Sequence, residues 1–429
     1  MAKDDDIPTG RLQRFRKMAG MATSVGAGLA ADRVKRLFGG QGSGHELAAK
    51  RILETLGSLK GAALKAGQMA SMFADQLPPE TRVVLSKLFS QAPTMPFEKL
   101  APVLEKELGR PLDEVFAELS KEPLAAASLG QVHAAKLRTG EDVVVKVQYP
   151  GVAEALEDDL QNLESMLGAI GMSGLVDSGT YAQEIRTEIG GELDYLRELS
   201  FLQRFRELYA RWPDLAAPLP FPELCTARVL VMERFRGTTL GNIDASSTSE
   251  EERWRRAEQL VRATWGPWIL HRAIHADTHP GNFILLEDGR LGVLDFGCVK
   301  FGSEAFHAAS LEVLRHTLGG PRPDWVDVMG RAGFTMNLPE DKARALLTEI
   351  VELSRGPVSG FVDFGRDDTL MKLAGLKRTR PLDLVRVKPP AESLLVGRAL
   401  GGLLQNLKLL GAKGDLRPVF RELLASVEA

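Results

Sequence analysis

The feature that most constrains this 429-residue chain is an Asp-Gly pair at 288–289, set between two short apolar runs in HADTHPGNFILLEDGRLGVLDFG. Such a pair is among the strongest short-range signals for a β-hairpin. With these two as the turn residues, Asn282 falls opposite Asp295, and directly opposed residues have Cβ atoms about 4.5–5.5 Å apart. An amide oxygen beside a carboxylate suits Mg²⁺, which takes oxygen ligands. The sequence therefore predicts a magnesium site at the open end of a hairpin.

Asp277, five positions before Asn282, adds a second carboxylate. Asp-x₄-Asn, followed by Asp-Phe-Gly after a short hairpin, is the layout of a kinase catalytic loop and its metal-binding aspartate. Pro280 and Gly281 interrupt helix formation, so the loop can fold back toward the hairpin. A surface hairpin with polar ends is the alternative for these residues taken alone. A one-residue slip in register would also move Asn282 away from Asp295.

The strand EDVVVKVQ indicates the other half of a nucleotide site. Alternation puts three valines on one face and Lys146 on the other. Lys146 matches the lysine of Val-Ala-Ile-Lys, which contacts nucleotide phosphates and pairs with a helix glutamate. Its expected partner is Glu192, although an acidic helical stripe is usually a solvated face. LVMERF is expected to lead into a hinge whose backbone binds adenine, at Met232, Glu233 and Phe235.

The glycine-rich phosphate loop of common kinases is missing. At its position the chain has AAASLGQVH, and alanine resists the positive φ angles that glycine allows. We therefore expect a phosphate cover of a different shape, formed by Ala125, Ala126, Ala127 and Ser128. After Gly297 the helical pattern returns without an Ala-Pro-Glu segment. The platform on which protein kinases bind a peptide substrate is thus predicted to be absent.

Composition limits the class of partner and the compartment. A net charge of −3 argues against nucleic acid, because phosphate binding favours a basic excess. Two distant cysteines describe neither a disulfide framework nor a zinc site, so we expect a cytoplasmic protein. The uncharged segment 18–31 is shorter than the roughly 20 residues of a spanning helix, and basic residues flank it. A packed terminal helix is favoured there, with peripheral membrane contact as the alternative.

The pattern along the chain predicts an α+β protein. The linker GGQGSG ends a basic N-terminal segment, and helical periodicity follows as far as Lys121-Glu122. Two β-rich runs around a Thr-Gly-Glu-Asp turn then begin a small lobe, and helix dominates the rest. We expect boundaries that divide the chain into 1–45, 46–122, 123–240 and 241–429.

Five motifs together resemble the UbiB/AarF family of atypical kinase-like proteins: LKAGQMAS (64–71), AAAS (125–128), ELDYLRE (192–198), HADTHPGN (275–282) and LDFG (294–297). The resemblance covers roughly residues 46–300. It implies a two-lobed, protein-kinase-like fold with a helical extension packed over the active site. The family is associated with ubiquinone and isoprenoid-lipid metabolism, often at membranes.

On that resemblance, Asp277 corresponds to the catalytic aspartate, Asn282 and Asp295 to metal ligands, and Lys146 with Glu192 to the nucleotide-binding pair. Lys65 and Gln68 match the family's Lys-x-Gly-Gln motif. Three residues apart on a helix, they project from one face and would enter the cleft where a protein substrate otherwise lies. Glu198 is expected to tether Lys65.

Two departures from the family pattern concern the loop and the C-terminus. Thr278 stands where family members usually carry proline. The run SLLVGRALGGLLQNLKLL contains Arg398 and Lys408, so it is expected to be an amphipathic core helix rather than a membrane span.

These observations favour an atypical kinase or ATPase that binds ATP or ADP with Mg²⁺ and acts in quinone or other isoprenoid-lipid biology. Its expected partners are the nucleotide, an isoprenoid lipid and proteins of the quinone pathway. Two alternatives stay open. One is a small-molecule phosphotransferase, which shares the Asp-x₄-Asn layout and needs no peptide platform. The other is a non-enzymatic, nucleotide-gated module that binds lipid or serves as a scaffold.

Overall fold

The computed structural model describes residues 94–126, 129–153, 191 and 193–428. The chain divides into two compact units, Met1–Leu199 with Pro220–Arg234, and Ser200–Leu219 with Phe235–Ala429. This division differs from the expected lobe boundary after residue 240. The reason is that residues 215–216 and 237–239 pair with the strands of the Asp-Gly hairpin, which belongs to the second unit.

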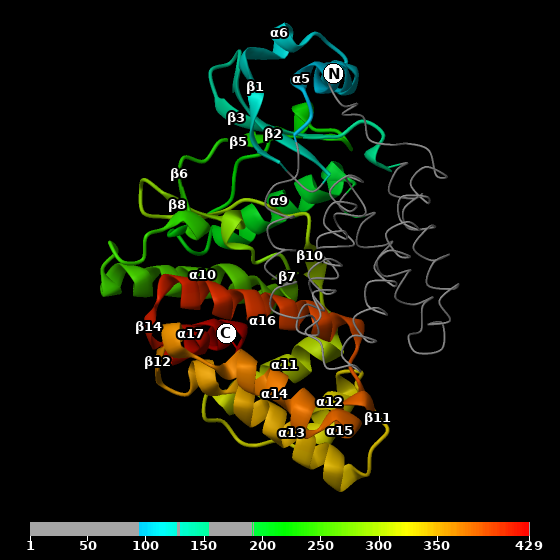
Figure 1. Ribbon diagram of the computed structural model, residues 1–429, viewed down its shortest axis with the longest axis vertical. Helices are drawn as coiled ribbons and strands as arrows, with labels where there is room; N and C mark the ends of the chain where they lie inside the picture. Colours follow the sequence, from blue (N-terminus) through cyan, green and yellow to red (C-terminus); the bar gives the residue numbers. More distant parts are fainter. Residues whose placement is uncertain (1–93, 127–128, 154–190, 192, 429) are drawn as a thin grey trace, which may run out of the picture. The chain divides into compact units, whose positions relative to one another are not determined.

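The first unit contains an antiparallel sheet in the order β1-β2-β3-β5 (Figure 1). Its strands are β1 (Phe116–Ala126), β2 (Gly130–Leu137), β3 (Asp142–Gln148) and β5 (Val229–Glu233), and the helices α5 (Phe97–Leu108) and α6 (Leu112–Val115) precede it. The predicted alternation on β3 is confirmed. Its three odd-numbered valines, 143, 145 and 147, share one core with Leu100 and Leu104 of α5.

One expected helix is a strand. Helical periodicity was expected to continue to residue 120, but Phe116–Ala126 forms β1 at the edge of the sheet. Its pairing with β2 is irregular, with register shifts between Phe116 and Ala125. The segment is rich in helix-forming residues, yet β2 has backbone N–H and C=O groups that need partners, and this tertiary demand overrides local propensity.

The second unit is mainly helical. It contains α10 (Glu250–His271), α11 (Glu304–Thr317), α12 (Trp325–Arg331), α13 (Glu340–Ser354), α14 (Thr369–Thr379), α15 (Pro381–Val385), α16 (Ala391–Leu410) and α17 (Arg417–Glu428). α10 packs against α16 and α17 (Figure 1). Ser249 is the N-cap of α10, because its side chain accepts a hydrogen bond from the backbone N–H of Glu252 at 3.1 Å. α9 (Tyr195–Tyr209) runs from the first unit into the second.

Short strands position the loops of this unit. A four-stranded sheet has the order β4-β9-β8-β6, formed by Leu215–Ala216, Leu291–Val293, Phe283–Leu286 and Gly237–Thr239. Three two-stranded pairs are β7 (Ala273–His275) with β10 (Val299–Phe301), β11 (Thr335–Met336) with β13 (Val387–Lys388), and β12 (Phe361–Asp363) with β14 (Lys413–Asp415).

The Asp-Gly hairpin forms as predicted, but its register differs by one residue. Leu285 pairs with Leu291, and the N–H of Leu286 donates to the carbonyl of Arg290 at 3.0 Å. The loop therefore has three residues, 287–289, and ends at Gly289 with φ +89°. A three-residue hairpin that closes through a left-handed glycine is the next commonest alternative to the two-residue turn.

The expectation that Asn282 lies opposite Asp295 is consequently wrong. Asn282 lies opposite Leu294, whose N–H donates to the Asn282 carbonyl at 2.9 Å. Asp295 is the next residue along the chain.

Among the residues that the structure describes, no helix combines the length and apolarity needed to cross a membrane. α16 fits the prediction of a core helix, since Leu403, Leu407 and Leu410 are buried while Leu394 and Leu409 are exposed.

Replacing Gly289 by alanine should lower the free energy of unfolding by about 1–2 kcal/mol, because a left-handed backbone crowds Cβ against the following carbonyl. Gly289→Asn should lose less, since asparagine tolerates this conformation. Urea denaturation followed by circular dichroism measures both. Equal stability of Gly289→Ala and the parent protein would contradict the assigned loop.

Candidate active site

The pairing of β7 with β10 brings the two acidic segments of the second unit together. His275 pairs with Val299, and the N–H of Ala276 donates to the carbonyl of Cys298 at 2.9 Å. Asp277 therefore lies two residues after the end of β7, and Asp295 lies four residues before the start of β10. We call residues 276–282 the Asp277 loop. It ends in a short 3₁₀ turn at Pro280–Asn282, which does not continue into an α-helix.

Asn282 contacts Asp277, as the Asp-x₄-Asn spacing predicts for a shared site. Its Nδ2 donates to Asp277 Oδ2 at 2.9 Å and to the Asp277 carbonyl at 3.2 Å. With the amide nitrogen used in this way, the amide oxygen is the group that Asn282 can offer to a cation. The Asp295 carboxylate is oriented by the backbone of its own loop, since Oδ1 accepts from the Gly297 N–H at 2.9 Å.

These donors fit the chemistry of magnesium. Mg²⁺ commonly binds to proteins through one or two carboxylates and keeps several waters. No cluster of three or more His, Cys, Asp or Glu side chains that could hold a metal occurs in the described part of the chain. The amide oxygen of Asn282 and the carboxylate of Asp295 are the groups of this site that could bind a hard cation.

Sequence reasoning missed His275. Its ring is buried, and Nε2 donates to the backbone carbonyl of Asp295, which ties the start of one acidic segment to the other. Phe296 packs against this ring with centroids 5.6 Å apart, and Phe205 of α9 lies 6.4 Å away. The signal was a histidine two residues before Asp277, at the end of an apolar run.

α16 was also missed as a support of the Asp277 loop. Arg398 Nη2 lies 3.4 Å from Asp277 Oδ1, and Asn406 Nδ2 donates to the Thr278 carbonyl at 2.9 Å. Gly402 lies between them, and a Cβ at that position would overlap the Thr278 hydroxyl. Residues four apart share one face of a helix, so this face of α16 holds the loop. The detectable signal was two polar residues eight apart in an apolar run.

The contributions of these contacts differ in kind. Arg398 and Asp277 each keep about a third of their side-chain surface exposed, at 35% and 32%. An ion pair of this exposure contributes little to stability, so its main effect is to orient the carboxylate. Asn406 is buried and satisfies a backbone carbonyl that would otherwise lose its hydrogen bond.

In the first unit, Lys146 is buried in an ion pair with Glu198. Its Nζ lies 2.8 Å from both carboxylate oxygens, and only 10% and 4% of the two side chains are exposed. The same Nζ lies 5.0 Å from the centre of the Tyr195 ring. Tyr195 and Glu198 are three residues apart on α9, so one helix face receives the lysine.

This pairing corrects one expectation, the choice of Glu192 as the partner of Lys146, while the tether between Glu198 and Lys65 stays a prediction. Glu192 was expected to pair with Lys146, and Glu198 was expected to tether Lys65. In the structure Glu198 forms the ion pair with Lys146, whereas Glu192 and Lys65 lie outside the described residues. Gln148, two residues after Lys146, contacts the segment before α9, since its side chain donates to the Leu193 carbonyl at 2.8 Å.

The other residues expected at the nucleotide site belong to the first unit, to the second unit or to the part of the chain outside the described residues. Ala125 and Ala126 end β1 and pair with Val132 and Gln131. Ala127, Ser128 and Gln68 lie outside the described residues. Met232 and Glu233 pair with Val144 and Val143 on β3. Phe235 belongs to the second unit, where it packs against Ala216, Ile284 and Leu286. Their roles in nucleotide binding stay predictions.

A small antiparallel sheet with a buried Lys-Glu pair, and a helical unit carrying an Asp-x₄-Asn loop beside Asp-Phe-Gly, define a protein of the kinase-like class. The family model of the ABC1 atypical kinase-like domain matches residues 87–322. The chain therefore belongs to that family, and both the resemblance and the kinase-like fold are confirmed.

Two relatives are similar over nearly the whole chain. The atypical kinase COQ8B, mitochondrial, of Rattus norvegicus is 31% identical over 98% of this chain and 82% of its own. The atypical kinase COQ8, mitochondrial, of Saccharomyces cerevisiae is 30% identical over 99% of this chain and 86% of its own. A solved structure, Rv3197 with erythromycin from Mycobacterium tuberculosis, superposes with a TM-score of 0.61 at 27% identity, covering 90% and 97% of the two chains.

The Glu198→Gln substitution should lower the free energy of unfolding by about 3 kcal/mol, because it removes the carboxylate charge that pairs with the buried Lys146 ammonium. Lys146→Met combined with Glu198→Leu should recover most of that loss. Urea denaturation measures each variant, with Glu207→Gln, exposed on the same helix, as the control. A Glu198→Gln protein as stable as the control would contradict a buried pair.

Gly402→Ala should lower the free energy of unfolding by about 1–3 kcal/mol, because the new methyl group overpacks the contact with Thr278. Adding Thr278→Ala removes the overlapping hydroxyl and should restore part of the loss, a non-additive result expected of touching residues. Gly401→Ala is the matched control, since a Cβ there meets nothing within 4 Å. It should be neutral or stabilising. Equal effects at 401 and 402 would show that α16 does not contact the loop as described.

Proposed function

We propose that the protein binds a magnesium nucleotide, ATP or ADP, and acts as an atypical kinase or ATPase linked to ubiquinone or other isoprenoid-lipid metabolism. The single observation that carries the proposal is the arrangement of Asp277. One of its carboxylate oxygens accepts from Asn282 and the other faces Arg398. Asp295 follows the residue that pairs with Asn282. The link to ubiquinone rests on the family resemblance and on the COQ8 relatives, which are named atypical kinases.

The second unit would supply the groups that act on the transferred phosphoryl. In phosphoryl transfer the protein mainly positions the reactants and stabilises charge. Asp277, held at both oxygens, would orient an attacking hydroxyl or water and accept its proton. Asn282 and Asp295 would hold Mg²⁺, which when bound neutralises negative charge on the phosphates.

The first unit would supply Lys146 and the phosphate cover. The contact with Glu198 orients Lys146, whose ammonium would act as a fixed cation for phosphate oxygens. The alanine-rich segment at 125–128 would lie over the phosphates, and backbone groups at Met232, Glu233 and Phe235 would meet the base. Lys65 and Gln68 would exclude a protein substrate, as the family motif implies.

The small-molecule phosphotransferase is retained as a second candidate. One observation favours it, namely that the similar mycobacterial protein was solved with erythromycin. Transfer of labelled phosphate from ATP to a hydroxylated small molecule, with erythromycin as the first acceptor tested, would support this candidate. Nucleotide hydrolysis without an acceptor would support an ATPase, and nucleotide binding without turnover would support a gated module.

Mg²⁺ with ADP should raise the melting temperature of the parent protein by about 5 °C at a concentration near a hundred times Kd. Asp295→Asn should abolish the magnesium-dependent part of this shift, whereas Asp288→Asn, in the exposed turn of the same hairpin, should keep it. Thermal melts with and without Mg²⁺ measure both variants. An Asp295→Asn protein that retains the full shift would refute the metal assignment.

Asp277→Asn separates binding from chemistry in the same experiment. It should keep the shift with Mg²⁺ and nucleotide but lose about a hundredfold or more of any turnover, as expected when a general base is removed. Turnover should be measured with and without lipid vesicles, because membrane contact is the alternative interpretation of the basic N-terminal segment.

A further inference from the structure

Two buried polar side chains of β2, Gln131 and His133, lie beside the segment expected to cover the phosphates. Both are fully buried. Gln131 pairs with Ala126 and His133 with Pro123, so both residues lie next to the end of β1 that leads into the alanine-rich segment 125–128. The chemistry proposed above uses neither side chain.

Gln131 and His133 point to the core side of the sheet. Residues two apart on a strand share a face, and on β3 these two pair with Val147 and Val145, which belong to the core. Lys146 lies between the two valines along β3, so its side chain is on the opposite face. The two polar residues therefore support the sheet from behind, while Lys146 faces away from them.

A chain of hydrogen bonds runs from the start of α5 through both side chains to β1. The backbone N–H of Met95 donates to Gln131 Oε1, which fixes the orientation of the amide. Gln131 Nε2 then donates to His133 Nε2 at 3.2 Å. His133 Nδ1 lies 2.9 Å from the Ser120 carbonyl and carries the proton of that bond, because a carbonyl can only accept. We call these bonds the Met95–His133 link.

The link is compatible only with an uncharged imidazole. A proton on His133 Nε2 would set two donors against each other, since Gln131 already presents its NH₂ group there. Turning the Gln131 amide would give the ring an acceptor, but the Met95 N–H would then face the NH₂ group instead of the oxygen. Protonation therefore breaks one of the two bonds that Gln131 makes, whichever way its amide points.

The surroundings of His133 offer no counter-charge. Phe97 of α5 packs edge-on against the ring with centroids 5.4 Å apart. Burial lowers the pKa of His133, the Ser120 carbonyl opposes this shift, and no charged group contributes to it. The charged residues closest in sequence on the elements packed around the ring are exposed, half-buried or on the other face of the sheet: Glu98, Lys99, Lys121, Glu122 and Lys146.

The sign of the pH effect follows from this shift. Because the pKa of His133 in the folded protein lies below its ordinary value, the unfolded chain binds the proton more readily. The stabilisation that the neutral ring provides is therefore complete above the ordinary pKa of histidine, about 6.5. It is lost as the pH falls below that value.

We infer that Gln131 and His133 are positioning residues for the phosphate cover, and that they hold it only while His133 is uncharged. Their link joins Met95, which comes two residues before α5, to the ends of β1 and β2 on either side of 127–128. Acid would break the link and weaken nucleotide binding. The effect on nucleotide rests on the proposed function, whereas the protonation of His133 does not.

Nuclear magnetic resonance of the full-length protein with ¹⁵N-labelled histidine tests the link directly, because the spectra distinguish the two ring tautomers. At pH 7 the His133 ring should carry a proton on Nδ1 and none on Nε2. His133→Asn identifies the resonance, and its side-chain amide keeps a donor for the Ser120 carbonyl. A ring that is doubly protonated at pH 7, or that carries its single proton on Nε2, overturns the inference.

Gln131→Glu should reverse the protonation of the ring. A carboxylate can accept from the Met95 N–H and from a protonated His133 at once, so the ring should carry both protons at pH 7. Gln148→Glu is the matched control, because Gln148 is a buried glutamine of the next strand that donates to the carbonyls of Leu193 and Ala227. It should leave the ring neutral. Equal protonation of His133 in Gln131→Glu and the parent protein would contradict the link, whether or not the control folds.

Binding of ADP with Mg²⁺ gives the readout that a merely structural pair would not change. Between pH 7.5 and 5.5 the affinity of the parent should fall by about threefold to tenfold more than that of Gln131→Glu, the equivalent of one hydrogen bond. His133→Asn should bind as weakly at pH 7.5 as the parent does at pH 5.5, after the change common to all variants is subtracted. Equal losses in the parent and Gln131→Glu, with the tautomer as stated, overturn the positioning role. Absence of nucleotide binding at every pH refutes the proposed function and the positioning role with it, while the tautomer still decides whether the link exists.

Discussion

Three residue pairs between β7 and β10 are the constraint on which the candidate active site depends. Asp277 leaves one of these strands and Asp295 leads into the other, so the pairing brings together residues 18 positions apart. The buried His275 strengthens the link by donating to the Asp295 carbonyl. A short pair of strands is weak by itself, and the aromatic rings of Phe205, Phe283 and Phe296 around His275 supply the packing that supports it.

The ion pairs of the two candidate half-sites differ in burial. Lys146 and Glu198 are almost fully buried, so each depends on the other, because an unpaired buried charge is very costly. Asp277 and Arg398 remain a third exposed, so their contact orients more than it stabilises. A lysine held by a permanent counter-ion and an aspartate held loosely at both oxygens suit different tasks. Under the proposed function, the first would offer a fixed positive charge, and the second would exchange partners during the reaction.

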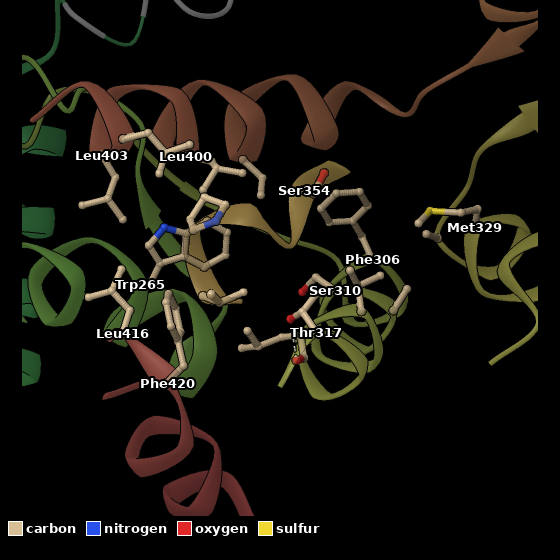
Figure 2. Close-up of a pocket in the computed structure, with 18 of the residues that line it drawn as sticks. Trp265, Phe306, Ser310, Thr317, Met329, Ser354, Leu400, Leu403, Leu416 and Phe420 are labelled. Carbon is tan, nitrogen blue, oxygen red and sulfur yellow. Dashed lines mark hydrogen bonds between the residues drawn. The ribbon is translucent and has the colours of Figure 1, made fainter. Parts of the chain in front are cut away.

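α16 joins several features of the second unit. Arg398, Gly402 and Asn406 lie on the face of α16 that contacts the Asp277 loop. Leu400 and Leu403 line an apolar cavity of the second unit (Figure 2). The close approach at Gly402 accommodates the hydroxyl of Thr278, the residue that departs from the family pattern. The two polar residues of this apolar run, Arg398 and Asn406, are thus the ones that contact the Asp277 loop.

Much of the fold and part of the site could be predicted, because the signals involved are local. The sequence by itself determined the hairpin, the contact of Asn282 with Asp277, the alternation of β3 and the N-cap of α10, all of which depend on residues close in the chain. Only the tertiary structure decided the partner of Lys146, the strand at 116–126, the hairpin register and the roles of His275 and Arg398. The partner and the strand follow from packing between distant segments, and the register from a choice between two turns of similar stability. Backbone pairing and burial select among such options, and the periodicity of a single sequence carries no record of that selection.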